Sequence, residues 1–192
     1  MRKSDVTRKT SETLIEINLS LDQKGESSID TGIGFFDHML TSFSKHSGID
    51  LIIKARGDLN VDFHHTIEDT GLVLGEALFK ALNTKIGINR YSSFIMCMDD
   101  ALVLCSIDLS GRSYFEMNYH FSDSKVGDFD TILLKEFFTA FTNNLKANIH
   151  FLVMRGNNTH HIIEACFKCL GKCMKDAIKI VDNNLLSTKG LL

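Results

Sequence analysis

Two short segments of the chain contain, in the same order, residue types that bind metal ions in enzymes. The first, His64–Glu68, reads HHTIE, and the second, His160–Glu164, reads HHIIE. Each residue of the second segment lies 96 positions after its counterpart, and Gly171 follows Gly75 by the same interval. This repetition indicates an internal duplication that includes a set of metal ligands.

The spacing within each segment suits a metal site on a helix. Residues four positions apart lie on one helical face, so His64 would face Glu68 and His160 would face Glu164. Imidazole and carboxylate ligands suit borderline divalent ions such as Mn²⁺, Fe²⁺, Co²⁺ or Zn²⁺. A helix cap or a polar cluster could use one such segment. Packing alone, however, gives no reason to duplicate both imidazoles and the carboxylate.

The composition is that of a globular chain. Its 192 residues are 44% hydrophobic, and a chain of this length buries roughly 70% of its unfolded surface. With a net charge of −3 and no run of Lys or Arg, it lacks the basic surface that nucleic acid requires. No apolar run approaches the ~20 residues of a membrane span, and no hydrophobic signal segment begins the chain. We expect a soluble, cytoplasmic protein.

Short strands and helices alternate along the first half. Residues 1–11 are polar and predict a frayed arm that becomes a strand, whereas residues 13–21 alternate apolar and polar side chains as a strand does. The remaining elements are expected to be strands at 28–31, 51–55 and 59–63, a helix at 35–45, and a helix that ends at 82. The predicted order is therefore β-β-α-β-β-α.

The second half is expected to repeat this order. Its predicted elements are strands at 94–98, 101–108, 114–119 and 149–154, a helix at 132–145, and a last helix that ends at 180. A tight turn between two strands explains Asp99-Asp100 better than a paired-carboxylate site does. The sequence predicts an α+β fold of two pseudo-symmetric halves, residues 1–92 and 93–192, in a single domain. Each half would be a four-stranded sheet with helices packed on one face.

Several stretches together resemble one enzyme family. In chain order they are Arg8-x-Thr10-x-Glu12-Thr13, Asp30–Met39 (DTGIGFFDHM), His64–Asp69 (HHTIED), Asp108–Arg112 (DLSGR), Gly127–Thr131 (GDFDT), the segment from His160 to Lys168, and Ser187–Gly190 (STKG). Along nearly its whole length the chain is similar to the imidazoleglycerol-phosphate dehydratases, hydro-lyases of histidine biosynthesis.

The resemblance implies a metal cofactor and an assembly. The cofactor would be two Mn²⁺ ions per active site, with other divalent metals possible. The assembly would be a homo-oligomer of 24 subunits with sites shared between neighbours. By resemblance the ligands are His38, His64, His65, Glu68, His160, His161 and Glu164. Many family members have a further histidine ligand where this chain has Glu136, whose carboxylate could bind Mn²⁺ in its place.

The implied reaction removes water from imidazoleglycerol phosphate to give imidazole-acetol phosphate. The substrate imidazole, bound between two metals as an imidazolate, would help to expel the neighbouring hydroxyl, with the metals as Lewis acids. Glu12 is expected to be the base that takes the remaining proton. The residues expected in catalysis are Glu12, His38, His65, Glu68, His161 and Glu164.

The substrate phosphate needs fixed cations, and arginine suits a bidentate contact with it. Besides Glu12, the residues that match the family's substrate-binding positions are Arg90, Arg112, Lys168, Ser187 and Lys189. His46 is expected either to reach the substrate hydroxyls or to be structural. Without the resemblance, each of the four cations would be taken for a surface charge.

Two other functions could use the same ligands. A dimetal hydrolase of phosphoesters would activate water and release phosphate. A non-catalytic metal-binding shell protein would take up metal without turnover, and Glu12→Gln would change no activity. We rank both below the dehydratase.

Overall fold

The computed structural model describes residues 2–24 and 26–190. Its first sheet contains β1 (Lys3–Lys9), β2 (Thr13–Ser20), β3 (Ser27–Asp30) and β4 (Asp50–Gly57), in the spatial order β1-β2-β4-β3. β3 runs parallel to β4, and the other neighbours are antiparallel. β2 alternates between the two faces: Ile15 and Ile17 are buried, while Glu16 is exposed, as expected for a strand with one face on the core.

The second sheet repeats this order. It contains β5 (Tyr91–Met98), β6 (Ala101–Asp108), β7 (Tyr114–Met117) and β10 (Asn148–Arg155), in the order β5-β6-β10-β7. Its parallel pair is β7 with β10, the counterpart of β3 with β4. A small hairpin of β8 (Lys125–Val126) and β9 (Phe129–Asp130) follows β7.

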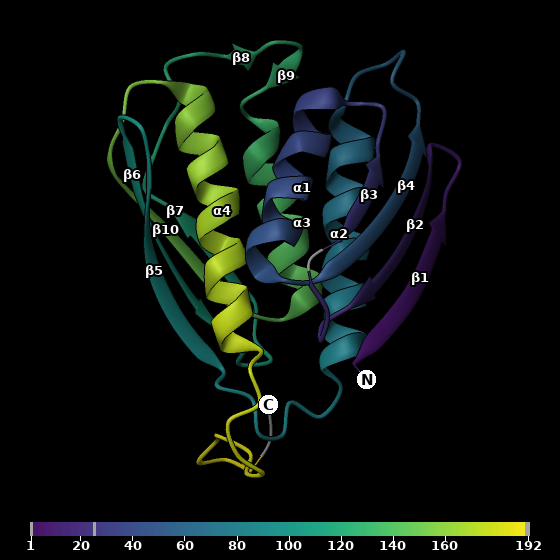
Figure 1. The fold of residues 1–192 in the computed structure, drawn as a ribbon. Coiled ribbons are helices and arrows are strands. Elements are labelled where there is room, and N and C mark those ends of the chain that lie inside the picture. Colours follow the sequence, from purple (N-terminus) through teal and green to yellow (C-terminus); the bar gives the residue numbers. More distant parts are fainter. Residues whose placement is uncertain (1, 25, 191–192) are drawn as a thin grey trace.

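In the described part of the chain, four helices lie between the two sheets: α1 (Gly34–Ser47), α2 (His64–Leu82), α3 (Leu133–Leu145) and α4 (Thr159–Ala177) (Figure 1). α1 packs on α4 and α2 packs on α3, so helices of different halves share the core. All four helices begin at one end of the molecule, the upper end in Figure 1. None of the described helices is both long and apolar enough to cross a membrane.

The predicted fold class is confirmed, with two four-stranded sheets that each have helices on one face. The predicted order of strands is wrong for the first half, which reads β-β-β-α-β-α, and the second half has the same order with the β8–β9 hairpin added before α3. The strand expected at 59–63 does not form. Instead residues 58–63 make a turn in which the carboxylate of Asp62 accepts a hydrogen bond from the backbone N–H of His64, at 2.7 Å. That turn starts α2.

The N-terminal segment forms a strand as expected, but the prediction that it is frayed is wrong for residues 3–9. β1 pairs with β2 over its whole length, from Lys3 opposite Ser20 to Lys9 opposite Leu14. Its polar composition is that of an edge strand, where charged side chains discourage pairing with other chains. Val6 is its one buried side chain, and Arg8 forms an ion pair with Asp69 of α2.

The outer faces of the two sheets differ, although the sheets share one plan. On the first sheet, Glu16 and Lys54 lie opposite each other and both are exposed. On the second sheet, Leu104 lies between Ile95 and Leu152, which are 51% and 43% exposed. The first outer face is therefore mostly charged, although it also exposes Ile52 (45%), while the second carries an apolar strip.

The two glycines that lie 96 residues apart mark places where helices approach closely. A Cβ atom on Gly75 of α2 would lie 2.3 Å from the carbonyl oxygen of Phe141 in α3. A Cβ atom on Gly171 of α4 would lie 2.9 Å from the carbonyl oxygen of Phe43 in α1. The repetition of this glycine therefore reflects the packing of the two helix pairs.

Gly75→Ala is expected to lower the free energy of unfolding by about 1–3 kcal/mol, because the added methyl group overpacks a backbone contact. Gly34→Ala is the matched control, since a Cβ atom there would meet no atom within 4 Å. Urea unfolding followed by circular dichroism measures both variants. Equal stability of the two would contradict the close α2–α3 contact.

Candidate active site

Both His-His segments lie on the first turns of their helices, α2 and α4. The Nε2 atom of His64 lies 3.4 Å from the Oε2 atom of Glu68, and the Nε2 atom of His160 lies 3.3 Å from the Oε2 atom of Glu164. The i, i+4 geometry expected from the spacing is therefore present in both copies.

The same kind of hydrogen bond, between a loop side chain and backbone N–H groups, is found at the start of both helices. The side chain of Asn158 accepts hydrogen bonds from the backbone N–H groups of His160 and His161, at 3.0 and 3.3 Å. Asp62, which binds the N–H of His64, lies 96 residues before Asn158. Such side chains stabilise helix starts by satisfying free N–H groups. Sequence reasoning missed this pair, although the common interval could have revealed it.

A third element completes one metal-binding group. Ligand atoms of His38 on α1, His160 and Glu164 all lie within 4.8 Å of one another. The start of α1 is fixed by Asp37, whose carboxylate accepts hydrogen bonds from the N–H and the hydroxyl of Thr31, at 2.9 and 2.6 Å. Three ligands of mixed nitrogen and oxygen type, brought from two helices, can hold a divalent ion.

Glu164 is the buried member of this group. Its side chain is only 8% exposed, and Lys168 one turn later donates a hydrogen bond to its Oε1 atom at 2.8 Å. Burial acts to raise the pKa of Glu164, but Lys168, His38 and His160 together hold it below its ordinary value. The carboxylate is therefore ionised and ready to bind a cation.

Two further carboxylates orient the second histidine of each segment. The Nδ1 atom of His65 lies 3.1 Å from Asp58, and the Nδ1 atom of His161 lies 2.7 Å from Asp100. The hydrogen bond to Asp58 raises the pKa of His65 above its ordinary value. When Nδ1–H donates to a carboxylate, Nε2 is left with a lone pair for a metal. Sequence reasoning missed both roles and took Asp100 for a turn residue only.

Asp100 is held by more than the histidine. The backbone N–H of Asn157, the ring of His161 and the N–H of Asn158 keep the pKa of Asp100 far below its usual range. The turn between β5 and β6 is thereby joined to the loop that starts α4. The expected turn at Asp99-Asp100 is present, and it also positions His161.

Asp100→Asn is expected to weaken metal binding roughly 10- to 100-fold, the usual cost of removing a carboxylate that orients a ligand histidine. Asp99→Asn is the matched control, because Asp99 is 72% exposed and lies 3.6 Å from the Nε2 atom of His161 rather than at Nδ1. Competition with a chelator of known affinity measures both variants. If the two variants bound Mn²⁺ equally well, Asp100 would not orient His161.

The expected base lies beside the first segment. Glu12 is in the turn between β1 and β2, and its carboxylate lies 3.8 Å from the Nδ1 atom of His65. Thr10 accepts hydrogen bonds from the N–H groups of Glu12 and Thr13, so the turn is ordered rather than part of a mobile arm. The Glu12 side chain is 52% exposed and free to approach a bound molecule.

Among the described residues, the metal-binding group does not include the other expected ligands, which are His64, His65, Glu68, His161 and Glu136, nor the expected substrate residue His46. Glu136 lies on the first turn of α3, at the same end of the molecule as the histidine segments, and its side chain is half-buried. His46 lies on the last turn of α1, where its Nδ1 atom is 2.8 Å from the carbonyl oxygen of Ser42. That helical position favours the structural alternative for His46.

Four of the expected substrate-binding residues line one pocket of about 780 Å³. They are Arg90, Arg112, Ser187 and Lys189. Arg90 is held in place by Asp108, at 2.7 Å, and it donates to the carbonyl oxygen of Leu186 at 2.5 Å, so that the C-terminal segment forms part of the pocket wall.

This pocket and the histidine group lie at opposite ends of α4. The backbone N–H of Arg90 donates to the carbonyl oxygen of Ala177, the last residue of α4, whereas His160 is on its first turn. A helix of this length spans about 27 Å at 1.5 Å per residue. Lys168 contacts Glu164, so within one chain it is separated from the other four residues.

Comparisons with known proteins decide the family. A family model described as imidazoleglycerol-phosphate dehydratase matches residues 31–174. Among the relatives with that name, one from Streptococcus sanguinis is 50% identical over 194 residues and aligns over 100% of both chains. Another, from Lachnoclostridium phytofermentans, is 51% identical over 191 residues, covering 98% of this chain and 97% of the relative. The chain belongs to the imidazoleglycerol-phosphate dehydratase family.

Solved structures of imidazoleglycerol-phosphate dehydratases have the same fold. The structure from Staphylococcus aureus superposes with a TM-score of 0.85 at 38% identity and covers 93% of this chain and 99% of that one. The structure from Pyrococcus furiosus, in complex with (S)-C348, has a TM-score of 0.85 at 40% identity and covers 97% and 100%. The resemblance seen in the motifs is confirmed: the chain is a hydro-lyase of histidine biosynthesis.

Proposed function

We propose that the chain dehydrates imidazoleglycerol phosphate to imidazole-acetol phosphate at a site with two Mn²⁺ ions. The observation that carries this proposal is the group of His38, His160 and Glu164, whose ligand atoms lie within 4.8 Å of one another. The donor types fit the ion, because imidazole and carboxylate suit Mn²⁺ and related divalent metals. His64, His65, Glu68 and His161 would supply the remaining ligands, with Glu136 as a further candidate.

When bound, the metals would act as Lewis acids that favour the imidazolate form of the substrate ring. The chain's own residues prepare the site for this. Asp58 and Asp100 hold the Nδ1 sides of the rings of His65 and His161, which leaves each Nε2 with the lone pair that a metal needs. Glu12, exposed beside His65, would take the proton that the substrate loses. Lys168 keeps Glu164 ionised and could also reach an anionic substrate.

The separation within one chain favours a site shared between subunits. The Arg90–Arg112 pocket suits a phosphate group because arginine offers paired N–H donors. It lies about one helix length from the histidine group, whereas a substrate of this size must touch both at once. A homo-oligomer, as in the proposed 24-subunit assembly, would place the pocket of one chain against the metal ligands of another. A cytoplasmic location suits a biosynthetic enzyme of this kind.

Turnover of imidazoleglycerol phosphate by metal-stripped protein, with and without added Mn²⁺, tests the proposal. The enol form of the product is followed by absorbance, and free phosphate is measured in parallel. We expect product to form only with Mn²⁺ and no phosphate to be released. Release of phosphate would instead indicate the hydrolase, and manganese uptake without turnover would indicate the shell protein.

A further inference from the structure

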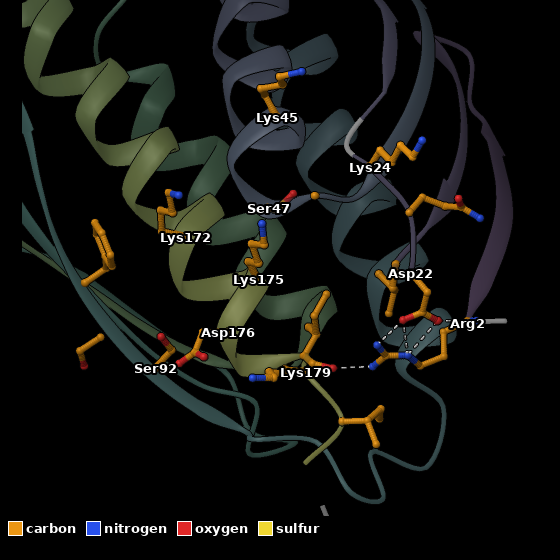
Figure 2. Close-up of a pocket in the computed structure, with 17 residues that line it drawn as sticks. Arg2, Asp22, Lys24, Lys45, Ser47, Ser92, Lys172, Lys175, Asp176 and Lys179 are labelled. Atoms are coloured by element: carbon orange, nitrogen blue, oxygen red, sulfur yellow. Dashed lines mark hydrogen bonds and ion pairs between the residues drawn. The ribbon is translucent and has the colours of Figure 1, made fainter.

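A second pocket, of about 950 Å³, lies away from both candidate sites. It opens between the C-terminal parts of α1 and α4, beside the segment that follows β2 and the start of β5 (Figure 2). No candidate metal ligand, and none of the residues Arg90, Arg112, Ser187 and Lys189, lines it. The proposed dehydration leaves this pocket without a role. Its volume is in the range of small-molecule sites.

Positive charge is concentrated in this pocket. Its charged lining residues are the cations Arg2, Lys24, Lys45, Lys172, Lys175 and Lys179 and the two acids Asp22 and Asp176. The whole chain, by contrast, has a net charge of −3. A cleft lined by one sign of charge raises the local concentration of oppositely charged ligands.

The lysines of the pocket are not neutralised by the chain. Arg2 is already engaged, because it donates to Asp22 at 2.5 Å and to the carbonyl oxygen of Ile178 at 2.6 Å. The five lysines form no ion pair with any carboxylate in residues 2–24 and 26–190. Elsewhere Lys80 and Lys125 do have such partners, Glu76 and Asp130.

The lysines also come from separate elements that face a common space. Lys172 and Lys175 lie near the C-terminal end of α4, Lys179 lies just past that end, and Lys24 and Lys45 come from the β2–β3 connection and α1 (Figure 2). Residues 172 and 175 are three positions apart, or about 4.5 Å along the helix axis, and Lys179 adds a further cation beyond the end of the helix. One small anion can contact only part of this row, whereas linked anionic groups can follow it.

We infer that this pocket binds an anion with two or more adjacent phosphate groups. Lysine is suited to this ligand because its ammonium group acts as a mobile point charge with three donors, which fits phosphates in varied positions. Phe94, which is 40% exposed and lines the pocket, offers a flat apolar surface to any ring attached to the phosphates. Inorganic polyphosphates and nucleoside polyphosphates both contain such adjacent phosphate groups.

Isothermal titration calorimetry with inorganic tripolyphosphate, ATP, orthophosphate and adenosine tests the inference on the full chain without added divalent metal. We expect tripolyphosphate and ATP to bind and orthophosphate and adenosine to bind at least roughly tenfold more weakly, since charge-assisted contacts supply the affinity. ATP binding more tightly than tripolyphosphate would identify a nucleotide ligand. Equal binding would identify the phosphate chain alone.

Lys172→Gln/Lys175→Gln is expected to weaken tripolyphosphate binding roughly 10- to 100-fold through the loss of two charge-assisted contacts. Lys9→Gln/Lys54→Gln is the matched control, because it removes the same charge from exposed positions of the first sheet. Arg112→Ala separates this pocket from the proposed phosphate site and should leave the binding unchanged. The inference is overturned if tripolyphosphate fails to bind, if both lysine pairs have equal effects, or if Arg112→Ala abolishes the binding. None of these outcomes depends on dehydratase turnover.

Discussion

Replacing His160 with alanine is expected to lower kcat/KM for imidazoleglycerol phosphate by about 1,000-fold or more, since a metal Lewis acid supplies several kcal/mol of transition-state stabilisation. The reason lies in the geometry of one cluster, where His160 lies 3.3 Å from Glu164 and shares its ligand group with His38. Without the imidazole, only Glu164 and His38 of this group remain, so the ion is held less tightly.

Two measurements decide this prediction: the metal content of the purified variant and its turnover at saturating Mn²⁺. His150→Ala is the matched control, because His150 is an exposed histidine of β10 that stacks on Tyr114 and is outside the ligand group. The control should keep its metal and its activity. If His160→Ala retained full metal content, the assignment of His160 as a ligand would be wrong.

The second large effect is expected when two inactive variants are mixed, because together they should restore activity. Arg112→Ala alone is expected to lower kcat/KM about 100-fold, since a bidentate arginine–phosphate contact is among the stronger charge-assisted hydrogen bonds. If each active site joins the metal ligands of one subunit to the phosphate pocket of another, co-assembly of His160→Ala and Arg112→Ala chains creates some intact sites. Random mixing in equal amounts should give roughly one quarter of the wild-type activity in a symmetric assembly.

The control mixture combines His160→Ala with Glu164→Gln. These residues belong to one ligand group within one chain, so every site of the mixed assembly carries at least one defect. This mixture should stay as inactive as its parents. Native mass spectrometry of differently labelled chains shows whether subunits have exchanged. Exchanged His160→Ala and Arg112→Ala chains without recovery of activity would disprove the shared site.

Local sequence features predicted the framework of the site. The i, i+4 spacing of each His–Glu pair is a property of a single helix, so it could be inferred before the helix ends were known. The period-2 pattern of β2 and the equal interval between the glycines likewise depend on nearby residues or on the duplication itself. These are the parts of the structure in which local preference and tertiary packing agree.

Contacts between distant segments could not be predicted in the same way. Asp100 lies 61 residues before His161, and the two meet only because the β5–β6 turn packs on the start of α4. β1 is held in the sheet by its pairing with β2. The polar composition of β1 did not indicate this pairing. To predict that Lys168 lies far from Arg90, one needs to know the direction of α4 relative to β5. Each depends on long-range packing that spacing does not encode.

The apolar strip of the second sheet affects the solubility of a newly synthesised chain. Ile95 and Leu152 expose about half of their side-chain surfaces, whereas the equivalent face of the first sheet has charged groups such as Glu16 and Lys54. Exposed β-strand surfaces of this kind promote aggregation when they stay uncovered. A newly synthesised chain that has not yet met other subunits would therefore be prone to aggregate through the outer face of its second sheet and not through its first. Soluble yield should then depend on how quickly that face is covered.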